Sequence, residues 1–281
     1  MMARLWSDRR GRFGLVLLGI TVGLAIAAPL ATTGQPAAQG DVVATRFLPP
    51  LARDLHGLFH LLGTDRFGRD LWTRLIYGAR ISLSVGALAT AISVTLGLMI
   101  GAVAGVWRGK VGTVLLGITD FALALPRVVL LLLLGALWQP SATLVIIVLG
   151  ITGWMTIARL VHGEARSVSA RPFVESARAL GAGRRRLLFR HVLPNTLTPV
   201  IVAAALGFGN AILLEAGLSF LGLGVQPPTP SWGNMIASGR DTLVNAPWVA
   251  TAPGVALVLV VLACTLLGDA LRDVLSPSTQ R

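Results

Sequence analysis

Residues 81–106 read ISLSVGALATAISVTLGLMIGAVAGV, an uninterrupted apolar stretch without a charged side chain. As an α-helix, this stretch is long enough to cross the roughly 30 Å hydrocarbon core of a bilayer. Five further apolar stretches of spanning length lie at 13–30, 113–137, 141–158, 197–214 and 249–267. Because backbone polar groups inside a bilayer must be satisfied within the segment, we expect each stretch to be a helix. The sequence therefore predicts an all-α, polytopic membrane protein with six transmembrane helices.

The composition supports this class of protein. Of the 281 residues, 54% are hydrophobic and 13% are charged. A net charge of +12 would point to nucleic acid in a soluble protein, but basic cytoplasmic segments explain it better in a membrane protein. We therefore expect a lipid bilayer, and no nucleic acid, as a partner. The one cysteine, Cys264, lies in an apolar stretch, which excludes a disulfide framework and a cysteine-based metal site.

The distribution of basic residues predicts the orientation. With six spans, residues 1–12, 107–112, 159–196 and 268–281 share one side of the membrane, and they are richer in Arg and Lys than the segments opposite. The positive-inside rule then places both termini and residues 159–196 in the cytoplasm. Arginines between residues 31 and 80 weaken this contrast. The N-terminus also resembles a signal peptide, but the length of its apolar run favours a retained span.

The expected organisation follows from these spans. A cytoplasmic N-terminus (1–12) precedes the first transmembrane helix (13–30) and an outer loop with an amphipathic segment (31–80). A five-helix core at 81–267 includes the cytoplasmic segment 159–196 and a second outer loop, 215–248, and the tail at 268–281 is cytoplasmic. The second loop combines prolines with Trp232 and Trp248. We expect it either to present a stiff aromatic surface for another protein or to cover helix ends.

Two spans carry unusual residues. Ala89, Ser93, Gly97, Gly101 and Gly105 form a stripe of small side chains, which favours close helix packing within the chain, with a subunit interface as the alternative.

In the third span, Pro126 predicts a kink. Asp120 and Arg127 are seven residues apart, which places them on one helical face roughly 10 Å apart along the axis. Charges inside a membrane often line a pathway, so these two residues and Glu215 are candidate pathway residues, although Asp120 also fits a position near the membrane interface.

The segment 171–195, RPFVESARALGAGRRRLLFRHVLPN, is polar and lies between two spans. Pro172 suits the first turn of a helix and Gly181 suits a left-handed stop, which predicts a helix at 172–180. Phe173, Ala177 and Leu180 share one face, with Val174 beside them. So short a helix is unstable alone. It therefore lies against a soluble partner or, as the alternative, against its own membrane domain, while the arginines also fit lipid headgroups.

This segment resembles a known motif. Glu175-Ser176-Ala177, then Gly181, then His191-Val192-Leu193-Pro194 is similar to the EAA motif of permease subunits of bacterial ABC importers, with Ser176 in place of Ala and His191 in place of Ile. The stretches GTDRFGRDLWTRLIYGAR (63–80) and EAGLSFLGLGVQPPTPSWG (215–233) resemble the peptide/nickel class of these permeases, in particular the second permease of dipeptide or oligopeptide importers (the DppC/OppC type). Arg127 departs from the family pattern, because the resemblance leads us to expect an apolar residue at this position.

The resemblance implies a MetI-like core in the bacterial inner membrane and a pathway for di- or oligopeptides. It also implies a second permease, two cytoplasmic ATPase subunits that bind ATP and magnesium, and an extracytoplasmic substrate-binding protein. The residues that it assigns to ATPase coupling are Phe173, Val174, Glu175, Ala177, Leu180 and Gly181. Nickel chelates, glutathione or other peptide-like solutes are the alternative cargoes.

The residues themselves indicate that the chain is not an enzyme. Around Gly109 and Lys110 the sequence lacks the first Gly and the Ser or Thr of a P-loop, and we expect no catalytic, metal or cofactor site. The rival class is a secondary transporter or channel that uses Asp120, Arg127 and Glu215 as coupling charges. The absence of paired broken helices in the sequence disfavours it.

Overall fold

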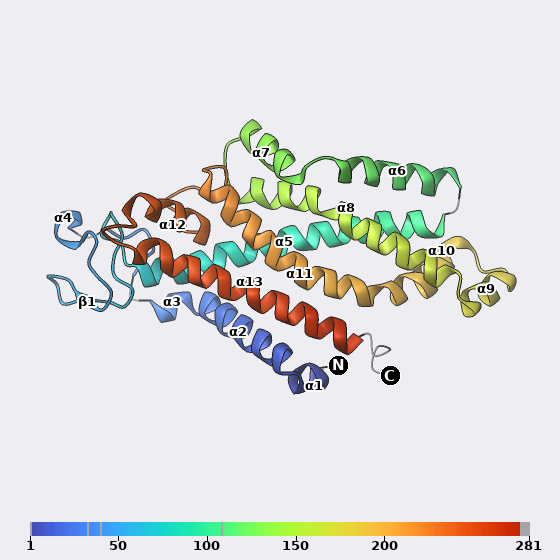
Figure 1. The fold of residues 1–281 in the computed structure, drawn as a ribbon, viewed down its shortest axis with the longest axis horizontal. Helices are drawn as coiled ribbons and strands as arrows, with labels where there is room; N and C mark the ends of the chain where they lie inside the picture. The colour runs from blue at the N-terminus through green and yellow to red at the C-terminus, as the bar shows by residue number, and fades with distance from the viewer. Residues whose placement is uncertain (1, 33, 40, 108, 276–281) are drawn as a thin grey trace.

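The computed structural model describes residues 2–32, 34–39, 41–107 and 109–275, and these are mostly helical. Long helices run side by side between two ends of the molecule (Figure 1). The elements in chain order are α1 (Met2–Ser7), α2 (Arg9–Ile26), α3 (Ala28–Ala31), α4 (Val42–Thr45), β1 (Ala52–Arg53), β2 (Phe59–His60), α5 (Leu71–Val106), α6 (Lys110–Ala124), α7 (Arg127–Leu137), α8 (Ala142–Ser169), α9 (Pro172–Ala179), α10 (Arg184–Arg186), the π-helix η1 (Leu187–Val192), α11 (Leu193–Phe220), α12 (Trp232–Gly239), the 3₁₀-helix η2 (Arg240–Thr242) and α13 (Trp248–Leu275).

Different helices and strands lie at the two ends of the molecule. One end, here the α9 end, holds α9, α10, α1 and the end of α13 (Figure 1). The opposite end, here the α12 end, holds α4, the β1–β2 pair and α12 (Figure 1). The start of α1 and the end of α13 therefore lie at the same end of the molecule as α9, and the side of the membrane on which they lie stays a prediction.

Four helices in the described part of the chain are long and apolar enough to cross a membrane, namely α5, α8, the continuous segment Arg184–Phe220 and α13. The bent pair α6–α7 would be a fifth span. The remaining candidate, α2, begins with Arg9, Arg10 and Arg12. Its uncharged part, 13–26, is roughly 21 Å long, which is shorter than the hydrocarbon core. The count of six spans therefore stays a prediction.

The stripe of small residues packs within the chain, against α8. A Cβ atom added at Gly97 would lie 2.6 Å from the Cβ of Ile157, and one added at Gly105 would lie 2.6 Å from the Cβ of Ala165. No side chain fits in these gaps, so glycine allows the two backbones to approach. This contact makes α5–α8 the most extensive helix pair of the fold.

The predicted third span is broken rather than kinked. Its two halves, α6 and α7, meet at an angle of 83°. Pro126 is the N-cap of α7, and the residue before it, Leu125, has the extended ψ of 131°. Proline disfavours the helical conformation of the residue before it, so the helix ends here. The prediction that Asp120 and Arg127 share one helical face is therefore wrong.

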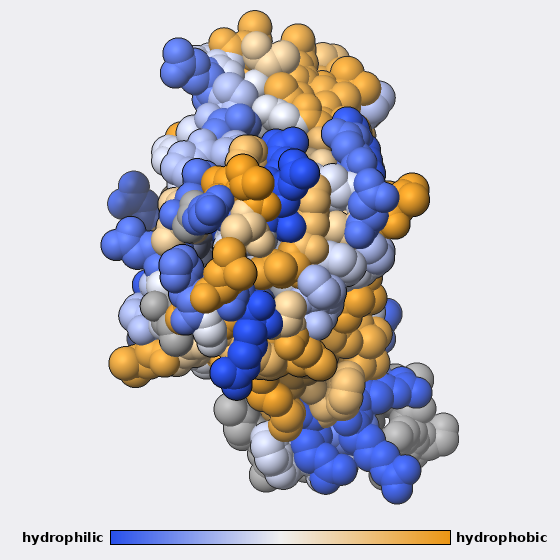
Figure 2. Space-filling model, turned by 90° about the vertical axis from the view of Figure 1, so that its left-hand side faces the viewer, coloured by the Kyte–Doolittle hydropathy of each residue, from blue (hydrophilic) through white to orange (hydrophobic). Residues whose placement is uncertain are grey.

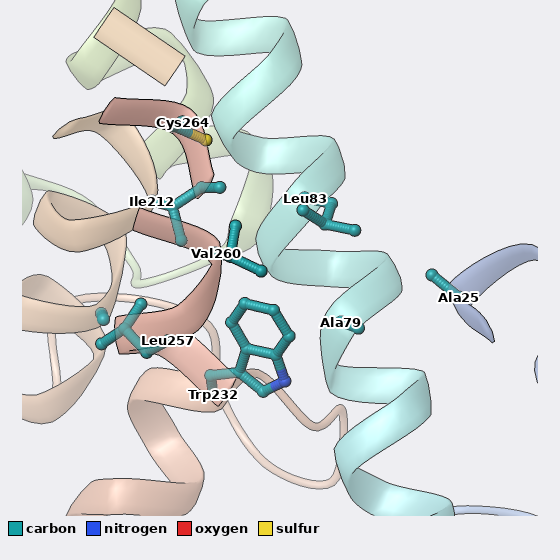
Figure 3. Packing of buried hydrophobic residues seen from close by; sticks show 9 residues of the cluster. Ala25, Ala79, Leu83, Ile212, Trp232, Leu257, Val260 and Cys264 are labelled. Atoms are coloured by element: carbon teal, nitrogen blue, oxygen red, sulfur yellow. The ribbon is translucent and has the colours of Figure 1, made fainter. Parts of the chain in front are cut away.

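A hydrophobic cluster near the α12 end ties α5, α11, α12 and α13 together, with Ala25 of α2 at its edge (Figure 3). Trp232 lies in this cluster with only 1% of its surface exposed, and its Nε1 donates to the Leu75 carbonyl at 3.1 Å. The Nε1 of Trp248 donates to the Thr64 carbonyl at 3.3 Å. Both rings therefore point inward, and the second outer loop covers helix ends instead of presenting an aromatic surface.

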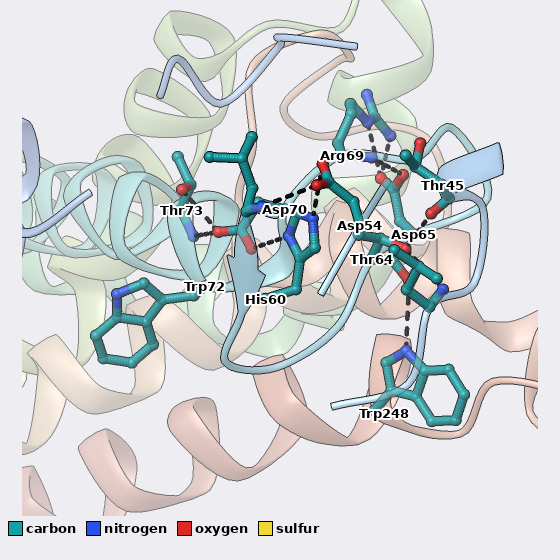
Figure 4. Close-up of polar contacts among 12 residues, drawn as sticks. Thr45, Asp54, His60, Thr64, Asp65, Arg69, Asp70, Trp72, Thr73 and Trp248 are labelled. Atoms are coloured by element: carbon teal, nitrogen blue, oxygen red, sulfur yellow. Dashed lines mark hydrogen bonds and ion pairs between the residues drawn. The ribbon is translucent and has the colours of Figure 1, made fainter. Parts of the chain in front are cut away.

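The segment before α5 is an ordered polar cap (Figure 4). Asp65 pairs with Arg69 at 2.7 Å and with Arg74 at 3.6 Å, and all three side chains are buried. Asp70 accepts from the Thr73 amide at 2.7 Å and from His60 Nδ1 at 2.8 Å. Since Asp70 caps α5 in this way, the helix starts at Leu71, well before residue 81. Of the predicted outer loop, residues 41–70 form α4, the β1–β2 pair and turns, and residues 71–80 are the start of α5.

Candidate functional site

The helix α9 has the punctuation that the sequence predicts. Pro172 occupies its first turn, and Arg171 before it has an extended conformation. At the other end Gly181 has a φ of +85°, the left-handed region. The Ala182 amide donates to the Ala177 carbonyl at 3.0 Å, and the Gly181 amide donates to that of Arg178 at 3.0 Å. This pair of hydrogen bonds is the Schellman motif that glycine permits at a helix end.

The apolar residues of α9 point in two directions rather than one. Val174 is fully buried among residues of α8 and η1, with Ala177 partly buried beside it. Phe173 is 43% exposed and Leu180 is 89% exposed. Val174 lies about 100° around the helix from Phe173, and it is the direction of Val174 that faces α8 and η1. The single apolar face predicted from the spacing is therefore wrong: α9 packs on its own domain through Val174, whereas Leu180 and Glu175 are exposed and Phe173 is half-exposed, with its ring centroid 6.3 Å from that of His191.

After the turn that follows α9, a continuous helical path leads from Arg184 into the membrane segment. Leu187 and Val192 of η1 pack in the same cluster as Val174. The path α10–η1–α11 runs from Arg184 to Phe220 without an interruption. The buried Val174 therefore joins α9 to the start of this helix. A π-helical turn such as η1 often occurs at a functional position.

A cavity of about 390 Å³ lies between α5, α7, α8 and α11, and Arg127 is in its wall. The Arg127 Nη2 donates to the Leu149 carbonyl at 3.4 Å. Asp120 lies elsewhere, 3.3 Å from Arg159, where it lines a second cavity of about 650 Å³ toward the α9 end. The two charges predicted as a pair therefore belong to different cavities.

Glu215, the third candidate pathway residue, has none of its surface exposed. Its Oε2 accepts from the Ser82 hydroxyl at 3.0 Å, and its Oε1 accepts from the Ser219 hydroxyl at 2.7 Å. The Trp232 amide donates to the Ser82 hydroxyl at 3.2 Å. Glu215 therefore links α5, α11 and α12 inside the chain, and it lines none of the cavities described above.

Thr90, Thr156 and Asn210 share the wall of the 390 Å³ cavity with Arg127, and no motif in the sequence predicts them as site residues. Isolated polar residues on three helices give no pattern along the chain. Only the packing of α5, α8 and α11 brings them to one cavity.

Comparisons with known proteins bear on these features. Residues 97–281 match the family described as "Binding-protein-dependent transport system inner membrane component". The chain is 43% identical over 274 residues to a protein of Brucella abortus biovar 1 (strain 9-941) that carries the name of a peptide transport system permease, covering 98% of this chain and 90% of that protein. It is 41% identical over 265 residues to the di/tripeptide transport system permease protein DppC of Pseudomonas aeruginosa (strain UCBPP-PA14), covering 94% and 86%. The dipeptide transport system permease protein DppC of Alkalihalophilus pseudofirmus is 39% identical over 264 residues, covering 94% and 84%.

Among solved structures, an inward-facing conformation of the MetNI methionine ABC transporter resembles the fold with a TM-score of 0.58. The identity is 21%, and the match covers 72% of this chain and 96% of that one. At this identity the likeness concerns the fold alone.

Proposed function

The chain belongs to the family of binding-protein-dependent transport system inner membrane components, and from that premise we propose that it is a permease subunit of an ATP-driven importer of di- and oligopeptides. The names of its relatives support a peptide cargo. Together with a second permease, it forms the translocation pathway. Two ATPase subunits and a substrate-binding protein complete the transporter.

The observation that carries this proposal is the division of α9 into a buried and an exposed side. The exposed Phe173 and Leu180 contact an ATPase subunit, while the buried Val174 holds α9 against η1. When two ATPase subunits close on ATP, they move α9, and the helix that starts at Arg184 carries the movement into the membrane. The energy difference between the two states of the transporter then directs the cargo inward.

We place the α9 end and both termini in the cytoplasm. The arginines that weaken the positive-inside bias lie largely in the polar cap, and two of them, Arg69 and Arg74, are paired with the buried Asp65. Paired arginines are held by the fold, so they do not oppose the orientation that the remaining basic residues favour.

The substrate-binding protein docks at the α12 end. Apolar side chains lie among polar ones on this face (Figure 2). Val43, Leu55 and Val244 are each more than 80% exposed there. Mixed surfaces of this kind are suited to a partner that binds and leaves.

Cysteine cross-linking tests the assignment of the two ends. The natural Cys264 is buried and is first replaced by Ala. Leu180→Cys and Val244→Cys then provide exposed thiols, one at each end of the molecule. We expect Leu180→Cys to cross-link to an ATPase subunit in native membranes, and Val244→Cys to react with a membrane-impermeant maleimide from outside the cell. Cross-linking of the ATPase through position 244 instead, or purification of an active chain without ATPase partners, would overturn the proposal.

A further inference from the structure

We propose that the 390 Å³ cavity between α5, α7, α8 and α11 receives a carboxylate of the cargo, and that the Arg127 guanidinium binds it. This inference rests on the proposed function, because it assumes that the cargo passes this cavity. It goes further by assigning the chemical group that the membrane part of the transporter recognises.

The cavity lies at the middle of the membrane segments. Its wall includes Ala89, Gly153 and Gly207, which are near the midpoints of α5, α8 and the helix Arg184–Phe220. In transporters with a midplane site, a group on the cargo at this depth is far from both aqueous surfaces. A charged side chain there is costly unless it has a partner or a function.

Arg127 has no ion-pair partner among the described residues. Its Nε is buried and makes no hydrogen bond, and its one hydrogen bond from Nη2, to the Leu149 carbonyl, is long at 3.4 Å. In the described part of the chain, no acidic residue lines the cavity. Arg127 is also the first residue of α7, so its charge adds to the positive end of the helix dipole. The electrostatics of the cavity therefore favour an anion.

The neighbours of Arg127 leave room for that anion and offer it further donors. A Cβ atom at Gly153 would lie 3.1 Å from Nη2 of Arg127, so the glycine gives the guanidinium its place. Thr90 Oγ1 is buried without a hydrogen-bond partner, and the Asn210 side chain lies in the same wall. A guanidinium binds a planar carboxylate through two parallel hydrogen bonds, and a hydroxyl can donate a third. Every peptide with a free C-terminus carries such a carboxylate.

An acidic residue of the second permease is the other source of a carboxylate for this cavity. A cargo carboxylate is favoured because the donors lie on three helices around a hollow space, which suits a ligand that enters and leaves. The experiment below separates the two sources.

The test is uptake by proteoliposomes that contain the complete transporter and a fixed, saturating amount of its binding protein. One cargo is a dipeptide with a free C-terminal carboxylate, and the other is the same dipeptide with an amidated C-terminus. The measured quantity is the uptake rate of the free dipeptide divided by the uptake rate of the amidated dipeptide. Because the binding protein is identical in every assay, its own preference cancels when the ratios of variant and wild type are compared.

For Arg127→Gln we expect the ratio to fall by about tenfold or more, since hydrogen bonds to charged groups are worth more than 1.4 kcal/mol, the equivalent of tenfold. Arg127→Lys keeps the charge but lacks the two parallel donors of the guanidinium, so its ratio should fall less. Thr90→Val keeps the shape and removes a hydroxyl that the fold does not use, so it provides a second test with a smaller fall. Arg272→Gln removes an exposed charge at the α9 end and leaves the ratio unchanged.

Each other result has a defined meaning. If the wild type imports the free peptide but Arg127→Gln and Thr90→Val keep its ratio, the carboxylate inference is overturned while the proposed function stands. If Arg127→Gln slows both cargoes equally and the second permease no longer co-purifies, the partner carboxylate belongs to that permease, and the inference is again wrong. If the wild type imports neither cargo, the proposed function fails, and the inference fails with it.

Discussion

Replacing Gly181 with valine tests whether the helix stop at the end of α9 has a functional role. Gly181 has a φ of +85°, and a Cβ added there meets nothing within 4 Å. The substitution therefore creates no clash, and its whole effect is the cost of a left-handed backbone. That cost is about 1–2 kcal/mol for an L-residue, which changes a local equilibrium roughly 5- to 30-fold.

Gly183 provides a matched control two residues away. It also has open space around its Cβ, but its φ of −66° and ψ of 158° suit any residue. We expect Gly183→Val to behave as wild type. Gly181→Asn should lie between, because asparagine tolerates the left-handed region better than other side chains.

Two measurements make the comparison. Hydrogen exchange of residues 172–181 in lipid nanodiscs should quicken roughly 5- to 30-fold in Gly181→Val, since it reports local opening of α9. ATP-driven uptake should fall while ATP hydrolysis continues, because the ATPase then moves a helix end that no longer transmits the displacement. Normal exchange and normal uptake in Gly181→Val, or equal damage from Gly183→Val, would refute the reasoning.

Three further substitutions test the packing. Gly101→Ala places a Cβ within 2.8 Å of Val161 and against the backbone of α8. We therefore expect thermal unfolding to show a free energy of unfolding that is lower by about 1–3 kcal/mol. Gly163→Ala, which has open space around its Cβ, should show no such loss. Glu215→Ala removes the acceptor of two buried hydroxyls and leaves a cavity; chemical denaturation should show a loss of about 2–5 kcal/mol, and wild-type stability would contradict the buried network. Asp65→Asn leaves two buried arginines without their counterion, which should lower the free energy of unfolding by about 3–5 kcal/mol. Asp241→Asn, at an exposed ion pair, should lower it by less than about 1 kcal/mol. Equal losses in the two variants would be inconsistent with a buried ion-pair network in the polar cap.

Features that depend on neighbouring residues could be predicted from the sequence. The apolar stretches predict helices because a helix satisfies its backbone hydrogen bonds locally. Pro172 and Gly181 predict the two ends of α9 because proline and glycine restrict or free the backbone at their own positions. The family could likewise be inferred from short motifs, and the comparisons confirm it.

Features that depend on distant residues could not be predicted. Whether Phe173 or Val174 is buried depends on where α8 and η1 lie, since the helix offers both directions equally. The inward orientation of Trp232 depends on its contact with Leu75, far away in the sequence. Neither contact leaves a pattern along the chain.

The sequence by itself determined that this chain is helical, spans a membrane and carries a short punctuated helix between spans. Only the tertiary structure decided which groups lie next to the charged residues of the membrane segments. Glu215 meets Ser82 across 133 residues, and Arg127 faces a cavity that Asp120 does not share. The physical reason is that helix formation is a local equilibrium of the backbone, whereas the partner of a charge is set by which helices come together, and the 83° break at Pro126 changes that arrangement.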